Sequence, residues 1–384
     1  MVENTSDSDD GKNFDLVCFS HLRWNFVYQR PQHLLSRFAK QRRVFFIEEP
    51  VFVDEATKLN ITRREDYLFI VVPEISHSDS AAENVEEIQR KLIDRLFLEK
   101  NIDDFIVWFY TPMALAFAEH LQPTATIYDC MDELSGFKFA PPELVENEAK
   151  LFERADLVFT GGQSLYEAKK SQHKSVHAFP SSIDAEHFKK ARNIIEEPKD
   201  QKSIPHPRLG FCGVIDERMD VELLAEIAEL RPSWQFLMIG PIVKISDEDL
   251  PRRENIHYLG SKNYQELPNY LAGWDVALMP FALNESTKFI SPTKTPEYLA
   301  AGKPVVSTPI QDVVRPYGES GLVEIAATAE EFIAACEKVL KEDGEKRTAR
   351  ADEFLARMSW DKTWSQMAQM IDEIVNQKAK KSAA

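Results

Sequence analysis

The stretch from 274 to 308 gathers residues whose types and spacing suit the binding of phosphate and of neighbouring hydroxyl groups. Ser291, Thr293 and Lys294 stand at the start of an expected helix, where backbone N–H groups and a partial positive charge attract anions. Glu297 follows about one turn later, where its carboxylate can accept two hydrogen bonds from adjacent hydroxyls such as those of a ribose. A first-turn glutamate can also do no more than complement the helix dipole, and the residue alone does not separate the two interpretations.

The elements that position these residues are predicted to be a strand, a long polar loop, a short helix and a second strand. The apolar runs at 276–279 and 304–307 suit strands buried on both faces of a parallel sheet. We expect Thr295 to cap the helix, Pro296 to occupy its first turn and Gly302 to end it. The helix would then start at the carboxyl end of a parallel strand, where doubly wound domains bind their ligands.

The pattern Pro-Phe, polar loop, Ser-Pro-Thr-Lys and Glu-Tyr-Leu-Ala-Ala-Gly-Lys-Pro-Val-Val-Ser-Thr resembles the donor-site segment of GT-B glycosyltransferases, in particular the family 4-like, group 1 enzymes. The resemblance implies that Glu297 holds the ribose of a nucleotide sugar. It also implies that the preceding loop binds the diphosphate and the sugar through Asn284, Thr287, Ser291, Pro292, Thr293 and Lys294.

One position departs from the family pattern. These enzymes usually carry a second glutamate eight positions before the first, facing the sugar, and this chain has Phe289 there. Glu285 and Asn284 are candidates to replace it, but the spacing does not decide between them.

A second loop of the carboxy-terminal half follows the expected strand that ends at Gly213. In the family this loop supplies an arginine and a lysine to the donor phosphates. Val214 takes the place of that arginine, so Arg218 becomes the candidate for the phosphate charge. The alternative is a surface arginine paired with a neighbouring acid. Gly240 ends another strand, where a missing side chain permits either close approach of a ligand or only a tight turn.

The amino-terminal half is where the family binds its acceptor. The loop HLRWNFVYQR follows the first expected strand, and two later strands end at Tyr110 and at the motif Tyr-Asp-Cys-Met-Asp-Glu, which resembles a family motif. Acids and histidines at these ends also serve as caps, turn formers or satisfied histidines, which is at least as good an explanation of each. The candidate acceptor-binding residues are Arg23, Trp24, Arg30, Tyr110 and Asp132, and the candidate catalytic residues are Asp129, His21, Arg218 and Lys294.

The alternation of expected strands and helices predicts an α/β protein with parallel sheets. With the resemblance, we expect two doubly wound Rossmann-like domains facing each other across a cleft, the GT-B fold. The expected parts are a disordered acidic tail (1–13), an acceptor domain (14–188), a charged linker (189–206), a nucleotide-sugar donor domain (207–358) and a helix returning to the first domain (359–384).

Composition limits the possible partners of the 384-residue chain. A net charge of −17 argues against nucleic acid. No apolar run approaches the roughly 20 residues that cross a bilayer, and the polar, acidic start is unlike a signal peptide, so a cytoplasmic location is expected. The four cysteines are widely spaced and are expected to be buried thiols. Nothing indicates an oligomeric state.

Residues 21–47 contain six Arg or Lys and no Asp or Glu. This local excess can attract an anionic membrane surface, or it can be a solvated helix face with phosphate-facing arginines, which we favour slightly.

The resemblance implies a glycosyltransferase that moves a sugar, with retention, from a nucleotide sugar, most commonly UDP-linked, to a saccharide or lipid-linked acceptor in cell-envelope polysaccharide or glycolipid synthesis. No metal or other cofactor is expected, and the Asp-x-Asp pattern Asp7-Ser8-Asp9 is discounted because it lies in the tail. The alternatives are a sugar-nucleotide epimerase or hydrolase of the same form, a catalytically silent binding subunit, or two α/β domains with separate functions.

Overall fold

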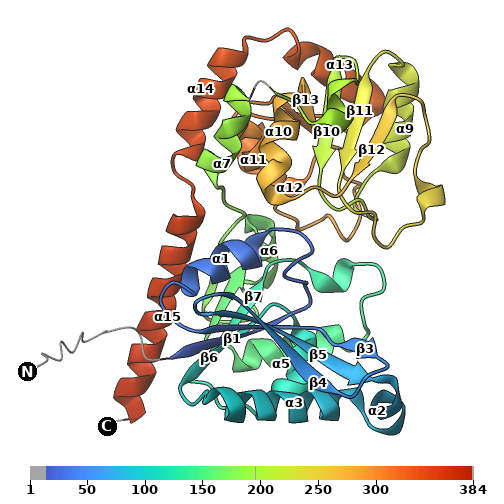
Figure 1. The fold of residues 1–384 in the computed structure, drawn as a ribbon. Coiled ribbons are helices and arrows are strands. Elements are labelled where there is room, and N and C mark those ends of the chain that lie inside the picture. Colours follow the sequence, from blue (N-terminus) through green and yellow to red (C-terminus); the bar gives the residue numbers. More distant parts are fainter. Residues whose placement is uncertain (1–13, 195, 383–384) are drawn as a thin grey trace, which may run out of the picture.

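The computed structural model describes residues 14–194 and 196–382, and it has two α/β halves, each built on a twisted sheet (Figure 1). The predicted tail at 1–13 lies outside the described residues. Each strand-rich core is apolar and continuous, as expected for parallel sheets covered on both faces.

The amino-terminal sheet has the strand order β3-β5-β2-β1-β6-β7-β8-β9, with parallel neighbours, and β4 adds to β5 in the antiparallel direction. The strands are β1 (Asp15–Ser20), β2 (Val44–Glu48), β3 (Val51–Val53), β4 (Lys58–Glu65), β5 (Leu68–Ser76), β6 (Phe105–Phe109), β7 (Ala125–Cys130), β8 (Leu157–Thr160) and β9 (Val176–Ala178). Strands β3 and β4 were not predicted from the sequence. The exposed polar residues of β4 leave little hydrophobic signal, because this strand lies at the edge of the sheet.

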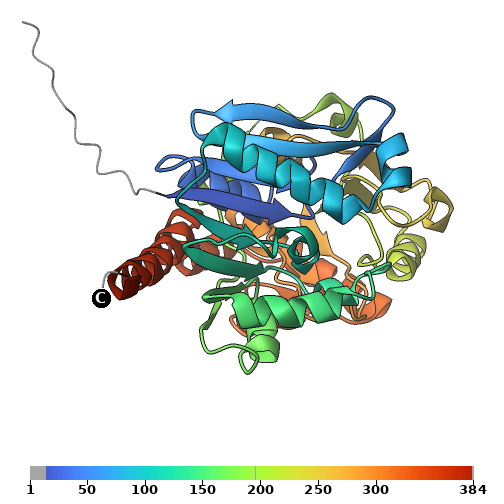
Figure 2. The same cartoon turned by 90° about the horizontal axis from the view of Figure 1, so that it is seen from below.

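Helices cover both faces of this sheet (Figures 1 and 2). One face packs against α1 (Arg30–Phe38) and the carboxy-terminal α15 (Trp360–Ser382), and the other against α3 (Val85–Lys100), α4 (Leu115–Ala118) and α5 (Leu144–Arg154). The remaining helices of this half are α2 (His77–Ala82) and α6 (Gln163–Lys169), with 3-10 turns at Pro112–Ala114 and Leu134–Gly136.

The carboxy-terminal sheet is parallel in the order β12-β11-β10-β13-β14-β15. Its strands are β10 (Arg208–Cys212), β11 (Gln235–Ile239), β12 (Ile256–Gly260), β13 (Val276–Met279), β14 (Val305–Ser307) and β15 (Glu324–Ile325). Its helices are α9 (Val221–Leu230), α10 (Leu267–Ala272), α11 (Lys294–Ala300), α12 (Gln311–Val313), α13 (Ala329–Val339) and α14 (Gly344–Leu355), with shorter turns at Asp247–Asp249, Tyr264–Glu266 and Val314–Gly318. The two sheets therefore confirm the predicted fold class.

The segment predicted as a linker is built differently from the expectation. It follows α7 (Ala185–Lys189) and contains a 3-10 turn (Lys190–Asn193) and α8 (Lys199–Lys202). Gln201 is fully buried, and its side-chain amide bonds the Tyr270 carbonyl and the Trp274 indole. Charge and proline suggested a linker, but buried Ala191 and Ile204 attach the segment to the second core.

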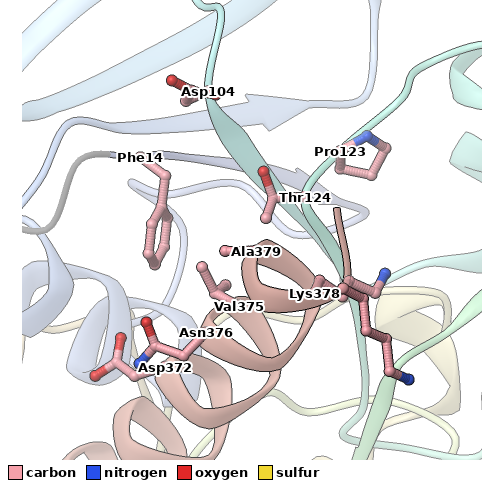
Figure 3. Close-up of a pocket in the computed structure, with 10 residues that line it drawn as sticks. Phe14, Asp104, Pro123, Thr124, Asp372, Val375, Asn376, Lys378 and Ala379 are labelled. Atoms are coloured by element: carbon pink, nitrogen blue, oxygen red, sulfur yellow. The ribbon is translucent and has the colours of Figure 1, made fainter. Parts of the chain in front are cut away.

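The last helix returns to the first domain. Trp360, Met367 and Ile371 of α15 are buried in the same core as α1 and β1. Figure 3 shows a groove beside the final turns of α15, lined by residues of that helix such as Val375 and by Phe14 and Thr124, which precede β1 and β7. Within residues 14–194 and 196–382, we find no helix whose length and apolar character would let it cross a membrane.

Candidate functional site

Three neighbouring cavities lie where the carboxyl ends of the two sheets face each other. The Glu297 cavity is lined from the second domain by Gly213, Arg218, Tyr264, Ser291, Pro292, Thr293, Lys294 and Glu297, and from the first by Tyr28, Gln29, Arg30, Asp132 and Ser181, among others. The His21 cavity adjoins it, because Gln29, Asp132, Val214 and Arg218 line both. The Gly240 cavity opens on the other side, between Trp24, Gly240, Lys262 and Tyr264.

Helix α11 starts two residues earlier than expected. Thr293 occupies the cap position with helical dihedral angles and no side-chain cap, so the prediction that Thr295 caps the helix was wrong. Thr295 is fully buried, and its hydroxyl donates to the Met279 sulfur at 3.5 Å, which ties the helix to β13. This placement puts Lys294 in the first turn, directed into the cavity.

The Glu297 carboxylate has no hydrogen-bond or ion-pair partner among the described residues, although it lines a largely enclosed cavity. Burial raises its pKa to about 7, and the nearby Lys294 ammonium opposes this rise. A partly buried carboxylate without a partner is costly unless a ligand supplies hydrogen bonds. Glu297 is therefore available to accept them.

Gly213 makes room for Lys294. A Cβ atom at Gly213 would lie 2.3 Å from Cε and 3.0 Å from Nζ of that lysine. Gly240 is constrained in turn by Gly213, because its φ is +143° and a Cβ there would lie 1.8 Å from the Gly213 carbonyl oxygen. Both glycines thus permit close packing at strand ends. Gly240 was predicted to bind the donor, but it lines the neighbouring cavity named after it and does not line the Glu297 cavity.

Arg218 both pairs with a neighbouring acid and faces the cavities. Its guanidinium holds the buried Asp216 with bonds of 2.9 and 2.6 Å, which is the acid pairing considered as the alternative. It nevertheless lines both the Glu297 and the His21 cavities, with its side chain 25% exposed and 5.4 Å from the ring of Phe137 in the first domain. The Asp216 carboxylate therefore orients a cation at the junction of the two cavities.

Two residues that were predicted to bind the nucleotide-sugar donor do not line the Glu297 cavity. Thr287 is buried, and its hydroxyl donates to the Ala282 carbonyl at 2.5 Å. Asn284 caps the same turn and donates to the Glu217 carbonyl at 3.0 Å. Both side chains shape the loop before α11, because the polar loop satisfies its own backbone groups first.

Phe289 points away from the cavity and packs against the core of the first domain. Glu285 is largely exposed and pairs with Lys288 at 3.5 Å, so neither it nor Asn284 replaces the glutamate that relatives carry. The side chain at position 289 therefore contacts the opposite domain.

The predicted catalytic Asp129 lies below the cavity floor. It is fully buried, and Arg30 clamps it with two bonds of 2.9 Å while also donating to the Phe179 carbonyl at 2.7 Å. Burial raises the pKa of Asp129, and Arg30 opposes the rise. Tyr110 is also buried and lines none of the three cavities. As placed, Asp129 and Tyr110 cannot touch an acceptor, which corrects the expectation for both.

Asp132 and His21 do reach the cavities. Asp132 lines both the Glu297 and the His21 cavities, and burial raises its pKa to about 6, opposed first by Arg218. His21 lines the His21 cavity, where burial lowers its pKa to about 4, and its Nδ1 has no hydrogen-bond partner among the described residues. A neutral imidazole with a free Nδ1 can accept a hydrogen bond.

The other two amino-terminal candidates have partly structural roles. Arg23 lines the His21 cavity and pairs with Glu48 at 3.1 Å. Trp24 lines the Gly240 cavity and packs edge-on against Phe46.

The residues that join the two domains around the site were not predicted from the sequence. Tyr28 stacks on Tyr264 with ring centroids 4.5 Å apart, and the Ser181 hydroxyl donates to the Ser291 carbonyl at 2.6 Å. Aromatic residues in loops carry no periodic signal, so only the packing of the two domains identifies these pairs. Among the described residues, no cluster of three or more His, Cys, Asp or Glu side chains is arranged to hold a metal ion.

Comparison with solved structures defines the class of fold. The E. coli structure described as trehalose-6-phosphate bound with UDP-2-fluoro glucose superposes with a TM-score of 0.68, covering 94% of this chain and 99% of that one at 13% identity. Sucrose-phosphate synthase from Thermosynechococcus elongatus gives a TM-score of 0.68 with the same coverage and identity. The chain has the GT-B fold.

Sequence comparison gives the family. Residues 206–342 match the family described as glycosyl transferases group 1, which agrees with the resemblance seen in the sequence. TuaH of Bacillus subtilis (strain 168), which is named as a teichuronic acid biosynthesis glycosyltransferase, is 28% identical over 260 residues. That match spans 60% of this chain and 62% of TuaH.

Proposed function

We propose that the protein is a glycosyltransferase that moves a sugar from a nucleoside-diphosphate sugar, most simply a UDP-sugar, to a saccharide or lipid-linked acceptor in cell-envelope polysaccharide synthesis. The observation that carries this proposal is the unpartnered Glu297 carboxylate beside Lys294 in the Glu297 cavity. The family match and the name of TuaH support the class of reaction and the biological setting.

The Glu297 cavity has the parts that a nucleotide sugar needs. Glu297 can accept hydrogen bonds from two ribose hydroxyls. Lys294 and Arg218 carry positive charge towards the place where a diphosphate would leave, which stabilises the charge that develops in the transition state. The Gly240 cavity beside it is open at two strand ends and suits a planar base. A metal ion is not needed in this proposal, because the two cations supply the charge.

The junction with the His21 cavity is where an acceptor would meet the sugar. Asp132 faces both cavities and can orient the acceptor hydroxyl or receive its proton. We propose retention of anomeric configuration, with the hydroxyl attacking from the face that the diphosphate leaves. The Tyr28–Tyr264 stack across the domains would help to exclude water, which otherwise hydrolyses the donor.

Contact with an anionic membrane finds little support in the geometry. Among the six basic residues of 21–47, the arginines each lie within 4 Å of an acid: Arg23 with Glu48, Arg30 with Asp129, Arg37 with Asp361, Arg42 with Asp372 and Arg43 with Asp15. Lys40 is left exposed. A peripheral site at the inner membrane face stays a prediction, and failure to co-sediment with anionic vesicles at low salt would remove it.

The function is tested by a thermal-shift panel of nucleoside diphosphates and their sugars, with and without magnesium. At 100 times its dissociation constant a nucleotide should stabilise the fold by about 2.7 kcal/mol. We expect one nucleotide to raise the melting temperature of wild type without magnesium, and Glu297→Ala to abolish the shift. Glu330→Ala, which changes an exposed first-turn glutamate of α13, is the matched control and should keep it.

Product analysis then separates the alternatives. Sugar transfer to an added saccharide supports the proposal. Turnover of the donor without any acceptor would indicate an epimerase or hydrolase, and binding without turnover across acceptors a silent subunit. No shift with any nucleotide would reject the whole proposal.

A further inference from the structure

The outer end of the His21 cavity carries two lysines, whose charge is only partly offset by an acid. Lys138 comes from the first domain and Lys244 from the second, and both are exposed. Among the described residues, Lys138 has no carboxylate within 4.0 Å, and Lys244 has only Glu217, at 3.9 Å. The other two cations of the cavity, Arg23 and Arg218, are occupied by Glu48 and Asp216. Lys138 thus has no acidic partner among the described residues, and Lys244 has one long ion pair.

The acids of the cavity lie elsewhere. Asp132 is at the inner end, shared with the Glu297 cavity, and Glu49 lies beside Arg23. Asp216, the third acid that lines the cavity, is held by Arg218, so the carboxylate nearest to the two lysines is that of Glu217.

Two of these outer residues hold strained backbone conformations. Among the described residues, the non-glycine positions with positive φ are Asn101, Phe139 and Lys244. Asn101 ends helix α3, where a left-handed residue is ordinary. Phe139 (φ 66°) and Lys244 (φ 63°) both line the His21 cavity. Such strain costs on the order of 1 kcal/mol or more and is concentrated at ligand-binding positions.

Aromatic rings accompany the lysines. The Phe137 ring lies 5.1 Å from Lys244 Nζ and 5.4 Å from the Arg218 guanidinium. Phe139 is 77% exposed, so hydrophobic burial does not explain its placement. An exposed ring beside cations fits a ligand with both an apolar face and negative charge, as a charged sugar has.

Glu217 brings the two lysine-bearing loops together. Its Oε1 accepts the Lys138 backbone N–H at 3.2 Å and lies 3.9 Å from Lys244 Nζ. Its Oε2 is buried and has no hydrogen-bond partner among the described residues. The lysine-bearing surface therefore exists only when the two domains are apposed.

We propose that the acceptor is an anionic saccharide, whose sugar ring lies on Phe139 and whose carboxylate or phosphate binds Lys138 and Lys244. This inference rests on the proposed function, since it assigns the acceptor of the same site. Carboxylate and phosphate share the chemistry that the two ammonium groups recognise. The hydroxyl to be glycosylated then points inwards to His21 and Asp132.

The test measures saccharide binding to the full chain saturated with UDP. The probes are a methyl hexoside, the corresponding methyl uronide and the corresponding 6-phosphate, compared by titration at low and at physiological salt. We expect wild type to bind at least one anionic member at least ten-fold more tightly than the neutral one, and which member it prefers identifies the group. Lys138→Gln with Lys244→Gln should abolish the preference and leave neutral binding unchanged, whereas Phe139→Ala should weaken both kinds of ligand.

The control is Lys288→Gln, which removes an exposed lysine of the loop before α11 that lies outside the cavity and should leave the preference intact. Equal binding of neutral and anionic saccharides by wild type overturns the proposal, as does a preference that survives in the double variant. The UDP-induced thermal shift is read in every sample, so failure of the donor site is distinguished from failure of this proposal.

Discussion

At the scale of single residues, Glu297 experiences opposing effects on its charge. Its cavity removes it from water and raises its pKa, and Lys294 lowers it. The outcome, a pKa of about 7 against an ordinary 4.5, means that the native state binds this proton more tightly than the unfolded chain. Stability contributed by the protonated form is therefore lost as pH rises from about 4.5 through 7.

Replacing Glu297 by Gln should remove that loss. From a shift of this size we expect the variant to be more stable than wild type at pH 8 by on the order of 3 kcal/mol, with little difference at pH 4.5. Denaturant unfolding at the two pH values measures this. Glu330→Gln serves as the control, and parallel stability curves for wild type and Glu297→Gln would contradict the assignment.

Gly213 allows a second residue-scale prediction. In Gly213→Ala the new methyl must displace the end of the Lys294 side chain, which is flexible, so stability should change little. Nucleotide affinity should fall about ten-fold or more, because a hydrogen bond to a charged group contributes roughly 1.5–3 kcal/mol. Titration with UDP measures the loss. Gly344→Ala in α14 has only an ordinary contact and is the control, and unchanged UDP affinity in Gly213→Ala would show that Lys294 does not bind the diphosphate.

At the scale of elements, the loop between β13 and α11 has one part that faces the Glu297 cavity and another part that contacts the first domain. Its last residues, from Ser291 to Lys294, face the cavity, and the middle of the loop, through Phe289, packs on the opposite domain. The loop can therefore link donor binding to apposition of the domains.

Phe289→Ala should weaken this link. Because the ring is half-buried, the loss of stability should be below the roughly 3–5 kcal/mol of a fully buried Phe→Ala change. We expect a larger radius of gyration for the UDP-bound variant by small-angle scattering, with several-fold weaker UDP binding. Leu283→Ala, an exposed position of the same loop, is the control. A radius equal to that of wild type would exclude a role in domain contact.

At the scale of the whole molecule, the chain crosses between the domains twice and completes the first core with its last helix. Ile371 is fully buried in a core that includes residues of α1 and β1, more than 300 positions earlier in the chain. The amino-terminal domain therefore depends on residues that lie far away in the sequence, beyond the second domain.

Ile371→Ala should lower the free energy of unfolding by roughly 2–5 kcal/mol, as large-to-small changes in a packed core do. Denaturant unfolding measures this, and UDP should still raise the melting temperature because the donor site is in the other domain. Gln377→Ala, on the exposed side of the same helix, should have little effect. Equal stability of the two variants would mean that α15 is not part of the core.

Much of the site could be predicted from the sequence because many of its residues are close together in the chain. Apolar runs identified β1, β7, β10 and β13, and the motif from Ser291 to Glu297 identified the donor-side residues with the family resemblance. Local spacing could not distinguish side chains that face a cavity from those that hold the loop, so the prediction included Thr287 and Asn284, which line none of the three cavities. Asp129 has the residue type of a catalytic acid, and only the burial of Arg30 beside it reveals an internal ion pair.

What the sequence alone determined is the pair of parallel sheets and the chemistry at their strand ends, since periodicity and local motifs are encoded by neighbouring residues. The tertiary structure decided which strand ends meet. The Tyr28–Tyr264 stack, the inward-packed Phe289 and the lysine pair at Glu217 each join residues from different domains. Such pairs leave no periodic signal, because they exist only when two separate cores bring their loops together.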